Sequence, residues 1–143
     1  MKKIKSYIFV IVFSLLTVFS FTGCSSSITK SSILDNLNEA RSARGYSTLV
    51  QDSQADALAG RLADLCIDYV FDNITERQFE NKSYDLMLTK INGKYFSGSY
   101  METYIPTRPS DFSGEKVVYC KGSIAGVAVR EYRGVTITYI IVY

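Results

Sequence analysis

The residues best suited to acid–base chemistry lie in one tyrosine-rich segment of the chain. Glu102 stands within residues 94–113, a stretch rich in Tyr, Ser and Gly, with Tyr100 and Tyr104 two positions away on either side. A carboxyl group with hydroxyl neighbours can exchange a proton with a substrate, and hydrolysis would use a second acid nearby. The candidates for that second acid are Asp85, Asp111 and Glu115. We therefore take Glu102, Tyr100 and Tyr104 as a candidate cleft.

The aromatic residues of this segment have two interpretations. In the structural one, they close the edge of the core under a long loop, which suits Phe96 best. In the functional one, tyrosines in a Ser/Gly-rich loop offer a large contact area at low entropic cost, as in binding loops. A single carboxylate among tyrosines is more often a hydrogen-bonded structural group than a catalyst. We favour the structural interpretation of these aromatic residues, and assign no catalytic residue.

Histidine is absent from the whole sequence. Its absence excludes Ser-His-Asp and Cys-His catalysis and zinc sites that use histidine ligands. Sites made only of acids suit calcium or magnesium, and Asp68 with Asp72 could hold calcium. However, no twelve-residue loop with a central glycine follows these two residues. We therefore expect no metal and no cofactor.

Cys66 and Cys120 could form a disulfide that joins the second predicted helix to the sheet, provided that the compartment is oxidising. Such a bridge would close a loop of roughly 50 residues and would stabilise the fold by about 4 kcal/mol on the chain-entropy model. In the alternative, Cys66 remains free, because it lies in an apolar stripe where cysteine behaves as a small buried hydrophobe. Both alternatives stay open.

The first 23 residues have the composition of an export signal. Lys2, Lys3 and Lys5 precede an apolar run of 15 residues from Tyr7 to Phe21, which is short of the roughly 20 that a membrane-spanning helix needs. The exit, Phe21-Thr22-Gly23-Cys24, resembles a bacterial lipobox. This resemblance implies cleavage before Cys24 and attachment of acyl chains such as palmitate at that residue. Each buried methylene contributes about 0.8 kcal/mol, so two or three chains would hold the protein on the membrane.

The chain that begins at Cys24 is close to neutral, with 13 of the 16 Lys and Arg residues against all 14 Asp and Glu residues. A nucleic-acid-binding surface needs a basic patch, so we expect no nucleic-acid partner. Residues 24–31 are short and polar, which predicts a tether. Residues 32–143 have the length of a single domain.

Hydrophobic periodicity predicts three helices. The first begins at a capping box of Ser32 and Asp35 and ends at Gly45. The second covers residues 53–70 and the third residues 83–91. Arg41 and Arg44 suit the negative end of the dipole of the first helix. We expect the charged residues on the outer face of the second helix to be solvated: Asp56, Arg61, Asp64 and Asp68.

Three segments rich in β-branched residues predict strands, at 117–120, 124–132 and 135–143. Tyr132-Arg133-Gly134 would join the last two as a hairpin. The final segment is apolar or aromatic at both alternating sets of positions, so both faces of the sheet should be covered at least in part. Gly126 and Ala128 would let a helix approach the sheet closely.

Both ends of the predicted domain carry a family resemblance. The residues concerned are Ile33 to Arg41, which includes an Asn-x-x-Arg spacing at Asn38, then Leu49, the alanine-rich stretch 55–63 and the strands at 124–129 and 138–142. They are similar to the CAP superfamily, the cysteine-rich secretory and pathogenesis-related proteins and their bacterial relatives. The resemblance implies an α/β/α sandwich with an antiparallel sheet and an extracytoplasmic binding role. The family's cleft typically uses two histidines and two acids; both histidines are missing here, and Glu102 stands where the family has an acid.

These observations together predict an α+β domain of the bacterial cell surface, lipid-anchored to the extracytoplasmic face of the membrane. Its expected role is that of a small binding or interaction module for an unknown envelope or extracellular ligand. One alternative is a carboxylate-dependent hydrolase that uses Glu102, and another is a purely structural envelope protein. A deep cleft beside Glu102 with a second acid would favour the hydrolase, whereas a shallow surface with exposed tyrosines would favour the binding module.

Overall fold

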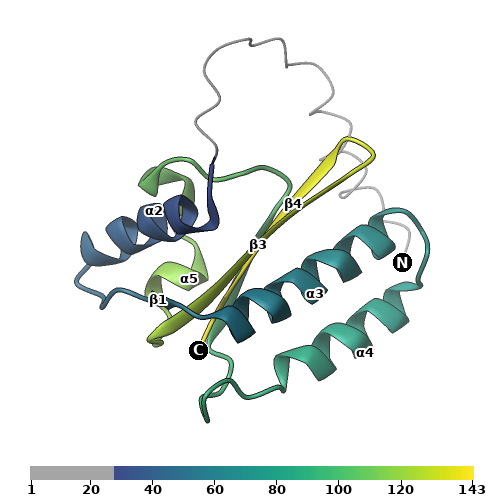
Figure 1. Ribbon diagram of the computed structural model, residues 1–143, viewed down its shortest axis with the longest axis horizontal. Helices are drawn as coiled ribbons and strands as arrows, with labels where there is room; N and C mark the ends of the chain where they lie inside the picture. The colour runs from purple at the N-terminus through teal and green to yellow at the C-terminus, as the bar shows by residue number, and fades with distance from the viewer. Residues whose placement is uncertain (1–27) are drawn as a thin grey trace.

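The computed structural model describes residues 28–143, which form a four-stranded sheet with helices packed on it (Figure 1). The fold class is α+β, as the sequence predicts. In chain order, the elements are α2 (Lys30–Ser42), β1 (Val50–Gln51), α3 (Ser53–Val70), α4 (Glu76–Met87), β2 (Gly98–Glu102), the 3₁₀ helix η1 (Pro109–Phe112), α5 (Lys116–Tyr119), β3 (Ile124–Tyr132) and β4 (Val135–Val142).

The strands are arranged in the order β1-β3-β4-β2. β3 and β4 form the predicted hairpin, in which Arg133 and Gly134 have φ angles of 49° and 77°. Two successive residues with positive φ are typical of the tight turn that matches the twist of paired strands. β2 is antiparallel to β4, but β1 is parallel to β3, so the expectation of a purely antiparallel sheet is wrong. The parallel pair arises because the two residues of β1 lie in the connection between α2 and α3, where they pair with the first two residues of β3.

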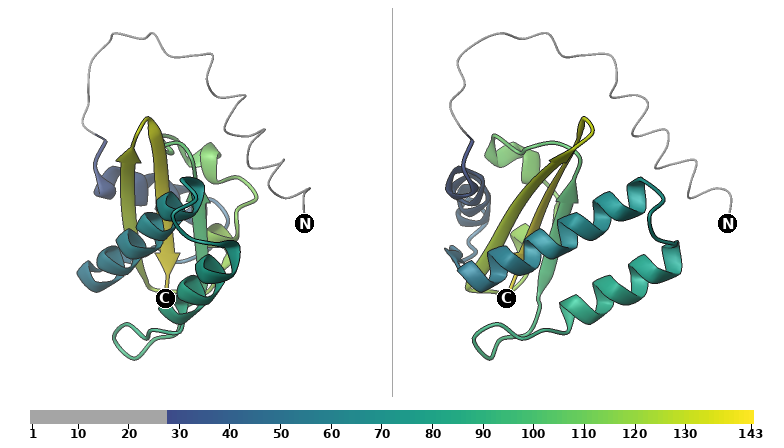
Figure 2. Two further views of the ribbon diagram at one scale, coloured as in Figure 1. Left: turned by 90° about the vertical axis from the view of Figure 1, so that its right-hand side faces the viewer. Right: turned by 45° about the vertical axis from the view of Figure 1, so that its right-hand side comes forward.

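Helices cover both faces of the sheet, as the pattern of the last strand predicts (Figure 2). On one face, Ile140 and Val142 of β4 belong to a buried cluster with residues of α2, η1 and α5, which we call the α2 core. On the other face, Ile137, Tyr139 and Ile141 belong to a cluster with residues of α3 and α4, which we call the α3 core. Successive side chains of a strand point to opposite faces, so one strand supplies both cores.

α3 lies almost in contact with the backbone of β3 at Gly126. A Cβ atom at this position would lie 2.0 Å from the carbonyl carbon of Ala55, so no side chain can be accommodated there. The expectation that Gly126 permits a close approach is therefore confirmed. Asp56, which we expected on the solvated face of this helix, instead accepts a hydrogen bond from the N–H of Val127 at 2.8 Å. β1 pairs only with Ile124 and Ala125 of β3. The Asp56 carboxylate therefore provides an acceptor for a backbone N–H of β3 that has no partner strand on that side.

Two helices begin earlier than the sequence analysis predicts. α2 has its capping box at Thr29 and Ser32, so the folded domain starts before the predicted boundary at residue 32. α4 starts at Glu76, after a capping box of Thr75 and Gln78. The Thr-x-x-Gln spacing is a standard signal for a helix start. It lies in a polar stretch without an apolar stripe, and periodicity alone therefore missed it.

Two predictions about the middle of the chain are wrong. Residues 94–113 are not irregular throughout, because Gly98–Glu102 pairs with β4 as strand β2. Conversely, the predicted strand at 117–120 is the short helix α5. Val117 and Val118 are adjacent, and both are fully buried in the α2 core, whereas successive residues of a strand would point to opposite faces of the sheet. Packing against α2 thus overrides the strand preference of valine.

The structure contains no bridge between Cys66 and Cys120, and both thiols are free. Cys66 lies in the α3 core and Cys120 in the α2 core. The sheet separates these two clusters, so the disulfide alternative is wrong. A disulfide requires the two Cα atoms to lie within about 7 Å of each other, which two cysteines on opposite faces of a sheet do not satisfy.

Candidate functional site

The Asn-x-x-Arg segment of α2 holds the following turn in place. Both ends of the Asn38 side-chain amide bond to the backbone of Leu49: Nδ2 donates to the carbonyl at 2.9 Å, and Oδ1 accepts from the N–H at 2.7 Å. Leu49 itself is buried in the α2 core. The Asn38 side chain thus pairs with both backbone groups of Leu49, as a neighbouring strand would. This fixes the position at which the chain enters β1.

Arg41, which the sequence analysis assigned to the negative end of the helix dipole, is 1% exposed. Its Nη1 donates to the carbonyls of Val117 at 2.6 Å and Cys120 at 3.1 Å, and its Nε donates to the carbonyl of Ser47 at 2.9 Å. These contacts tie α2 to α5. Arg41 follows Leu37 by four positions, and this placement on the apolar stripe is the sequence signal that would have indicated burial.

The three residues of the predicted cleft have different environments. Tyr100 is 3% exposed and packs against Phe112, with ring centroids 5.0 Å apart, so it is a core residue. Its hydroxyl lies 3.3 Å from that of Tyr104, which is 40% exposed. Burial raises the pKa of Tyr100 well above its usual range, so its hydroxyl stays protonated. Only Tyr104 of this pair can contact a ligand.

Glu102 is half-buried at the end of β2. Burial raises the pKa of its carboxyl group; the negative charge of Glu115 acts in the same direction, and the N–H of Thr103 opposes them. Of the other candidate acids, Asp111 already accepts hydrogen bonds from the backbone N–H groups of Thr107 and Arg108, at 2.9 and 3.1 Å. Glu115 is therefore the acid that the structure brings close enough to affect Glu102.

The remaining aromatic residues of the segment do not form one surface. Phe96 packs edge-on against Tyr143, with ring centroids 6.1 Å apart, which agrees with its structural interpretation. Tyr95 is exposed, with the amine of Lys90 4.2 Å from the centre of its ring. The predicted tyrosine-rich loop is thus divided between the core and separate exposed positions.

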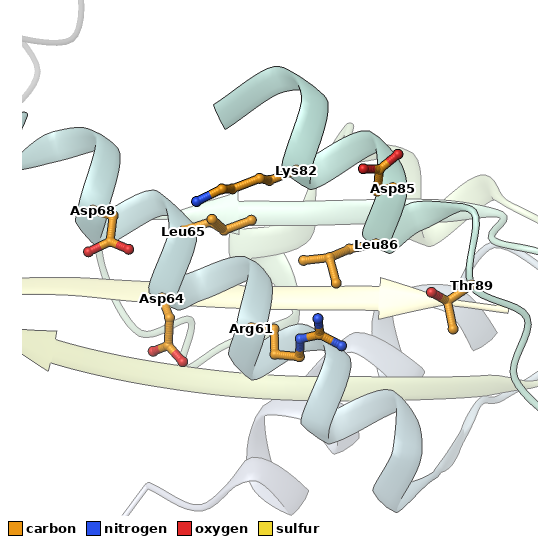
Figure 3. A pocket seen from close by; sticks show the side chains of 8 residues that line it. All are labelled: Arg61, Asp64, Leu65, Asp68, Lys82, Asp85, Leu86 and Thr89. Atoms are coloured by element: carbon orange, nitrogen blue, oxygen red, sulfur yellow. The ribbon is translucent and has the colours of Figure 1, made fainter. Parts of the chain in front are cut away.

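A groove with a volume of about 530 Å³ lies between α3 and α4 (Figure 3). The sequence analysis missed it, because it treated the charged face of α3 as solvated and did not predict that a second helix packs beside that face. The lining residues combine apolar, basic and acidic side chains from both helices with one residue that follows α4: Arg61, Asp64, Leu65, Asp68, Lys82, Asp85, Leu86 and Thr89.

The spacing of these residues explains why they meet. Arg61, Leu65 and Asp68 follow one another at four and three positions and so lie on one face of α3. Lys82 and Leu86 share one face of α4 in the same way, and Thr89 lies in the segment that follows the end of this helix at Met87. A leucine between charged or polar residues on two neighbouring helices is the signal that would have indicated the groove.

Asp64 is the only lining residue with an ion pair among residues 28–143. Its Oδ1 lies 2.8 Å from Nε of Arg130, which extends from β3. The guanidinium passes over Gly60, where a Cβ atom would lie 2.4 Å from Nη2 of Arg130. Asp64 is directed away from α4 in Figure 3, in keeping with this pairing. Arg61, Lys82, Asp68 and Asp85 thus have no salt-bridge partner within the described part of the chain.

Within residues 28–143, no group of three or more acids and cysteines is placed to hold a metal ion. This includes the surroundings of Asp68 and Asp72, the pair considered above for calcium. No helix in the same part of the chain is long and apolar enough to cross a membrane. The lipobox-like segment and Cys24 lie outside the described residues.

No protein-family model matches this chain, and neither a curated protein nor a solved structure matches it significantly. The likeness to the CAP superfamily therefore stays a prediction from the residues quoted above.

Proposed function

We propose that this protein is a lipoprotein of the bacterial cell surface, anchored in the membrane through Cys24, whose extracytoplasmic domain binds a small ligand. The observation that carries this proposal is the groove between α3 and α4. Its volume of about 530 Å³ falls in the usual range for ligand sites, roughly 300–1,000 Å³. Two of its eight lining residues are leucines and the other six are charged or polar, so polar contacts would contribute most to holding a ligand there.

The position of Glu102 supports a binding module over a hydrolase. Tyr100 and Glu102 are two positions apart on β2, so both side chains point to the face of the α2 core. The groove lies on the other face, on the side of α3 and α4. The sheet therefore stands between Glu102 and any ligand in the groove. A hydrolase would need a separate site built from Glu102 and Glu115, with Tyr104 as its exposed neighbour.

The anchor and the domain are close in sequence. Because Thr29 already caps α2, only residues 25–28 remain between Cys24 and the first helix. Five steps of extended chain cover at most about 18 Å. In this proposal, the domain works within a short distance of the bilayer surface, which suits a ligand of the cell envelope.

Kinship with the CAP superfamily is a further part of the proposal. It is supported by helices on both faces of the sheet and by the contacts of Asn38 and Arg41, which give the Asn-x-x-Arg spacing a role in joining α2 to the next turn and to α5. The missing histidines agree with a domain that binds without the family's metal site.

The anchor is tested by replacing Cys24 with Ser in a bacterium that processes lipoproteins. The wild-type chain should incorporate labelled palmitate and fractionate with membranes, and Cys24→Ser should do neither. A wild-type chain that takes up no label, together with a variant that stays equally membrane-bound, would contradict the anchor.

The binding function is tested by NMR on the ¹⁵N-labelled lipoprotein in detergent, titrated with low-molecular-mass fractions of bacterial envelope extract. We expect shifts at the amides of Arg61, Leu65 and Lys82, and none at Glu102. Shifts at Glu102 and Glu115 accompanied by turnover would favour the hydrolase. If no fraction shifts the groove residues, the binding proposal is wrong.

A further inference from the structure

An aromatic and basic cluster lies at the turn between β3 and β4. The ring of Phe71, the residue after α3, meets the ring of Tyr132, the last residue of β3, edge to face, with centroids 5.1 Å apart. The guanidinium of Arg133 lies 5.7 Å from the centre of the Phe71 ring and 5.2 Å from that of Tyr132. We call these three residues the turn cluster. Tyr132 is 43% exposed and Arg133 is exposed as well, so the cluster faces outward although its members hold one another in place.

The chemistry of the turn cluster matches the headgroup region of a phospholipid bilayer. Tyrosine is enriched at membrane interfaces, because its ring is apolar and its hydroxyl group is polar. Arg133 forms no ion pair within residues 28–143. A guanidinium that lies against a ring keeps the N–H groups at its edge free, and two of them can donate to one phosphate group. The cluster therefore offers rings to the outer ends of the acyl chains and donors to the phosphates beside them.

The surroundings of the turn cluster are not basic. Asp72 and Glu131 are exposed acids next to it. Glu131 precedes Tyr132 on β3, so its side chain points to the opposite face of the sheet. One arginine beside two acids gives no general attraction to a negatively charged surface. The match thus depends on the rings and on a phosphate contact, which every phospholipid offers, and the charge of the lipid should matter little.

The turn cluster lies at the end of the domain where the described chain begins. In Figure 1 and in both views of Figure 2, the first described residues and the β3–β4 turn lie at the same end of the molecule. The contacts agree with this view. At the start of α2, Nζ of Lys30 lies 3.4 Å from Asp56, which bonds to Val127 in the middle of β3. Beyond the end of α2, Val50 pairs with Ile124 at the beginning of that strand. α2 therefore begins on the side of the turn.

We propose that the turn cluster lies against the phospholipid headgroups of the membrane that holds the anchor. The inference rests on the proposed anchor at Cys24 and adds the orientation of the domain. The chain from Cys24 to Thr29 covers at most about 18 Å, so the end of the domain at which α2 begins is the end held near the bilayer. The turn cluster is the aromatic and basic surface at that end.

A second pair of similar chemistry lies at the opposite end of the domain. The ring of Tyr95, which is 69% exposed, has the amine of Lys90 at 4.2 Å from its centre. The N–H of Ser97, two positions further on, bonds to the carbonyl of Val142, the last residue of β4. The eight residues of β4 span about 27 Å from the turn to this point. Tyr95 therefore provides a control of the same chemistry at the end away from the anchor.

The test is NMR of the ¹⁵N-labelled lipoprotein in nanodiscs of phosphatidylcholine that contain a lipid with gadolinium chelated at its headgroup. Gadolinium broadens the signals of nearby amides and loses its effect steeply with distance. Compared with a diamagnetic chelate, we expect the amides of Phe71, Tyr132 and Gly134 to lose most of their intensity, while those of Lys94 and Tyr95 keep theirs. Tyr132→Thr combined with Arg133→Asn should abolish this difference between the two ends.

The double variant should fold like the wild type. Threonine keeps the preference for a strand at position 132, and asparagine before Gly134 gives the Asn-Gly pair that such turns favour. Circular dichroism checks this. Tyr95→Thr is the matched control, since it removes an exposed ring at the other end, and it should leave the pattern of broadening unchanged.

Three results would overturn the inferred orientation: equal broadening at both ends of the wild type, strongest broadening at Tyr95, or an unchanged pattern in the double variant. In each of these cases the lipoprotein would still reside in the nanodisc, and the anchor would stand. If instead the wild type took up no palmitate and did not stay with the nanodiscs, the anchor at Cys24 would be wrong, and the inferred orientation with it.

Discussion

Replacing Arg41 with Met should destabilise the domain strongly. Methionine has a similar length and flexibility, so it can fill the space without supplying any donor. The carbonyls of Val117 and Cys120, which accept from Nη1 at 2.6 and 3.1 Å in a buried environment, would lose their charged partner. Each buried carbonyl left without a hydrogen-bond donor costs about 1–3 kcal/mol. Part of this total is offset, because the variant no longer has to bury a charged guanidinium. We expect a net loss of about 2–4 kcal/mol in the free energy of unfolding.

Urea denaturation followed by circular dichroism measures this loss. With a slope of about 1.5 kcal/mol per molar urea, typical of a domain of this size, the midpoint should fall by about 1.3–2.7 M. Arg44→Met is the matched control, since Arg44 is close by but exposed. Its guanidinium hydrogen-bonds to the carbonyl of Ala40 at 3.2 Å and lies 5.7 Å from the centre of the exposed Tyr119 ring, without reaching the buried carbonyls. Its cost should stay below about 0.5 kcal/mol. If both variants lost the same amount, or if Arg41→Met lost less than about 1 kcal/mol, the guanidinium would not be what joins α2 to α5.

Three further predictions concern the core, the cysteines and Glu102. Gly126→Ala should cost at least about 2 kcal/mol in the same assay, because its Cβ would lie 2.0 Å from the backbone of Ala55; a loss below about 0.5 kcal/mol would mean that α3 shifts freely. Cys66 and Cys120 should both be alkylated after denaturation without reductant, and Cys66 should react slowly in the native protein at pH 8, because burial raises its pKa to about 12; one unreactive pair would indicate a disulfide. Because burial raises the pKa of Glu102, the folded state binds its proton more tightly than the unfolded state does. Stability should therefore fall as pH rises through the folded-state pKa, and Glu102→Gln should be more stable than wild type at pH 7 but not at pH 3. A pH-independent difference between the two proteins would contradict this.

Local sequence signals predicted much of the sheet and of its surroundings. The turn at Arg133 and Gly134 follows from the need for two positive φ angles between twisted strands. The alternation in β4 predicted that both faces would be covered, because a strand that is apolar on both sides cannot face water. Each of these features depends on a few neighbouring residues, whose conformational preferences the sequence shows directly.

The predictions that failed concern residues whose contacts lie far away in the chain. Val117 and Val118 have the preferences of a strand, yet α2 offers a surface that covers both of them only if they form a helix. Cys66 and Cys120 both lie in apolar stretches of the sequence. Nothing in the residues next to them indicates that they lie on opposite faces of the sheet.

The sequence by itself determined the fold class, the close approach of α3 at Gly126 and the segments that form the central hairpin. Only the tertiary structure decided that Arg41 is buried, that Glu102 faces away from the groove, and that the charged face of α3 meets a second helix. The physical reason is that periodicity shows which face of an element is apolar or charged, but not which other element lies against that face. Burial of Arg41 depends on carbonyls that are about 75–80 positions further along the chain, and the groove depends on the packing of α4 beside α3.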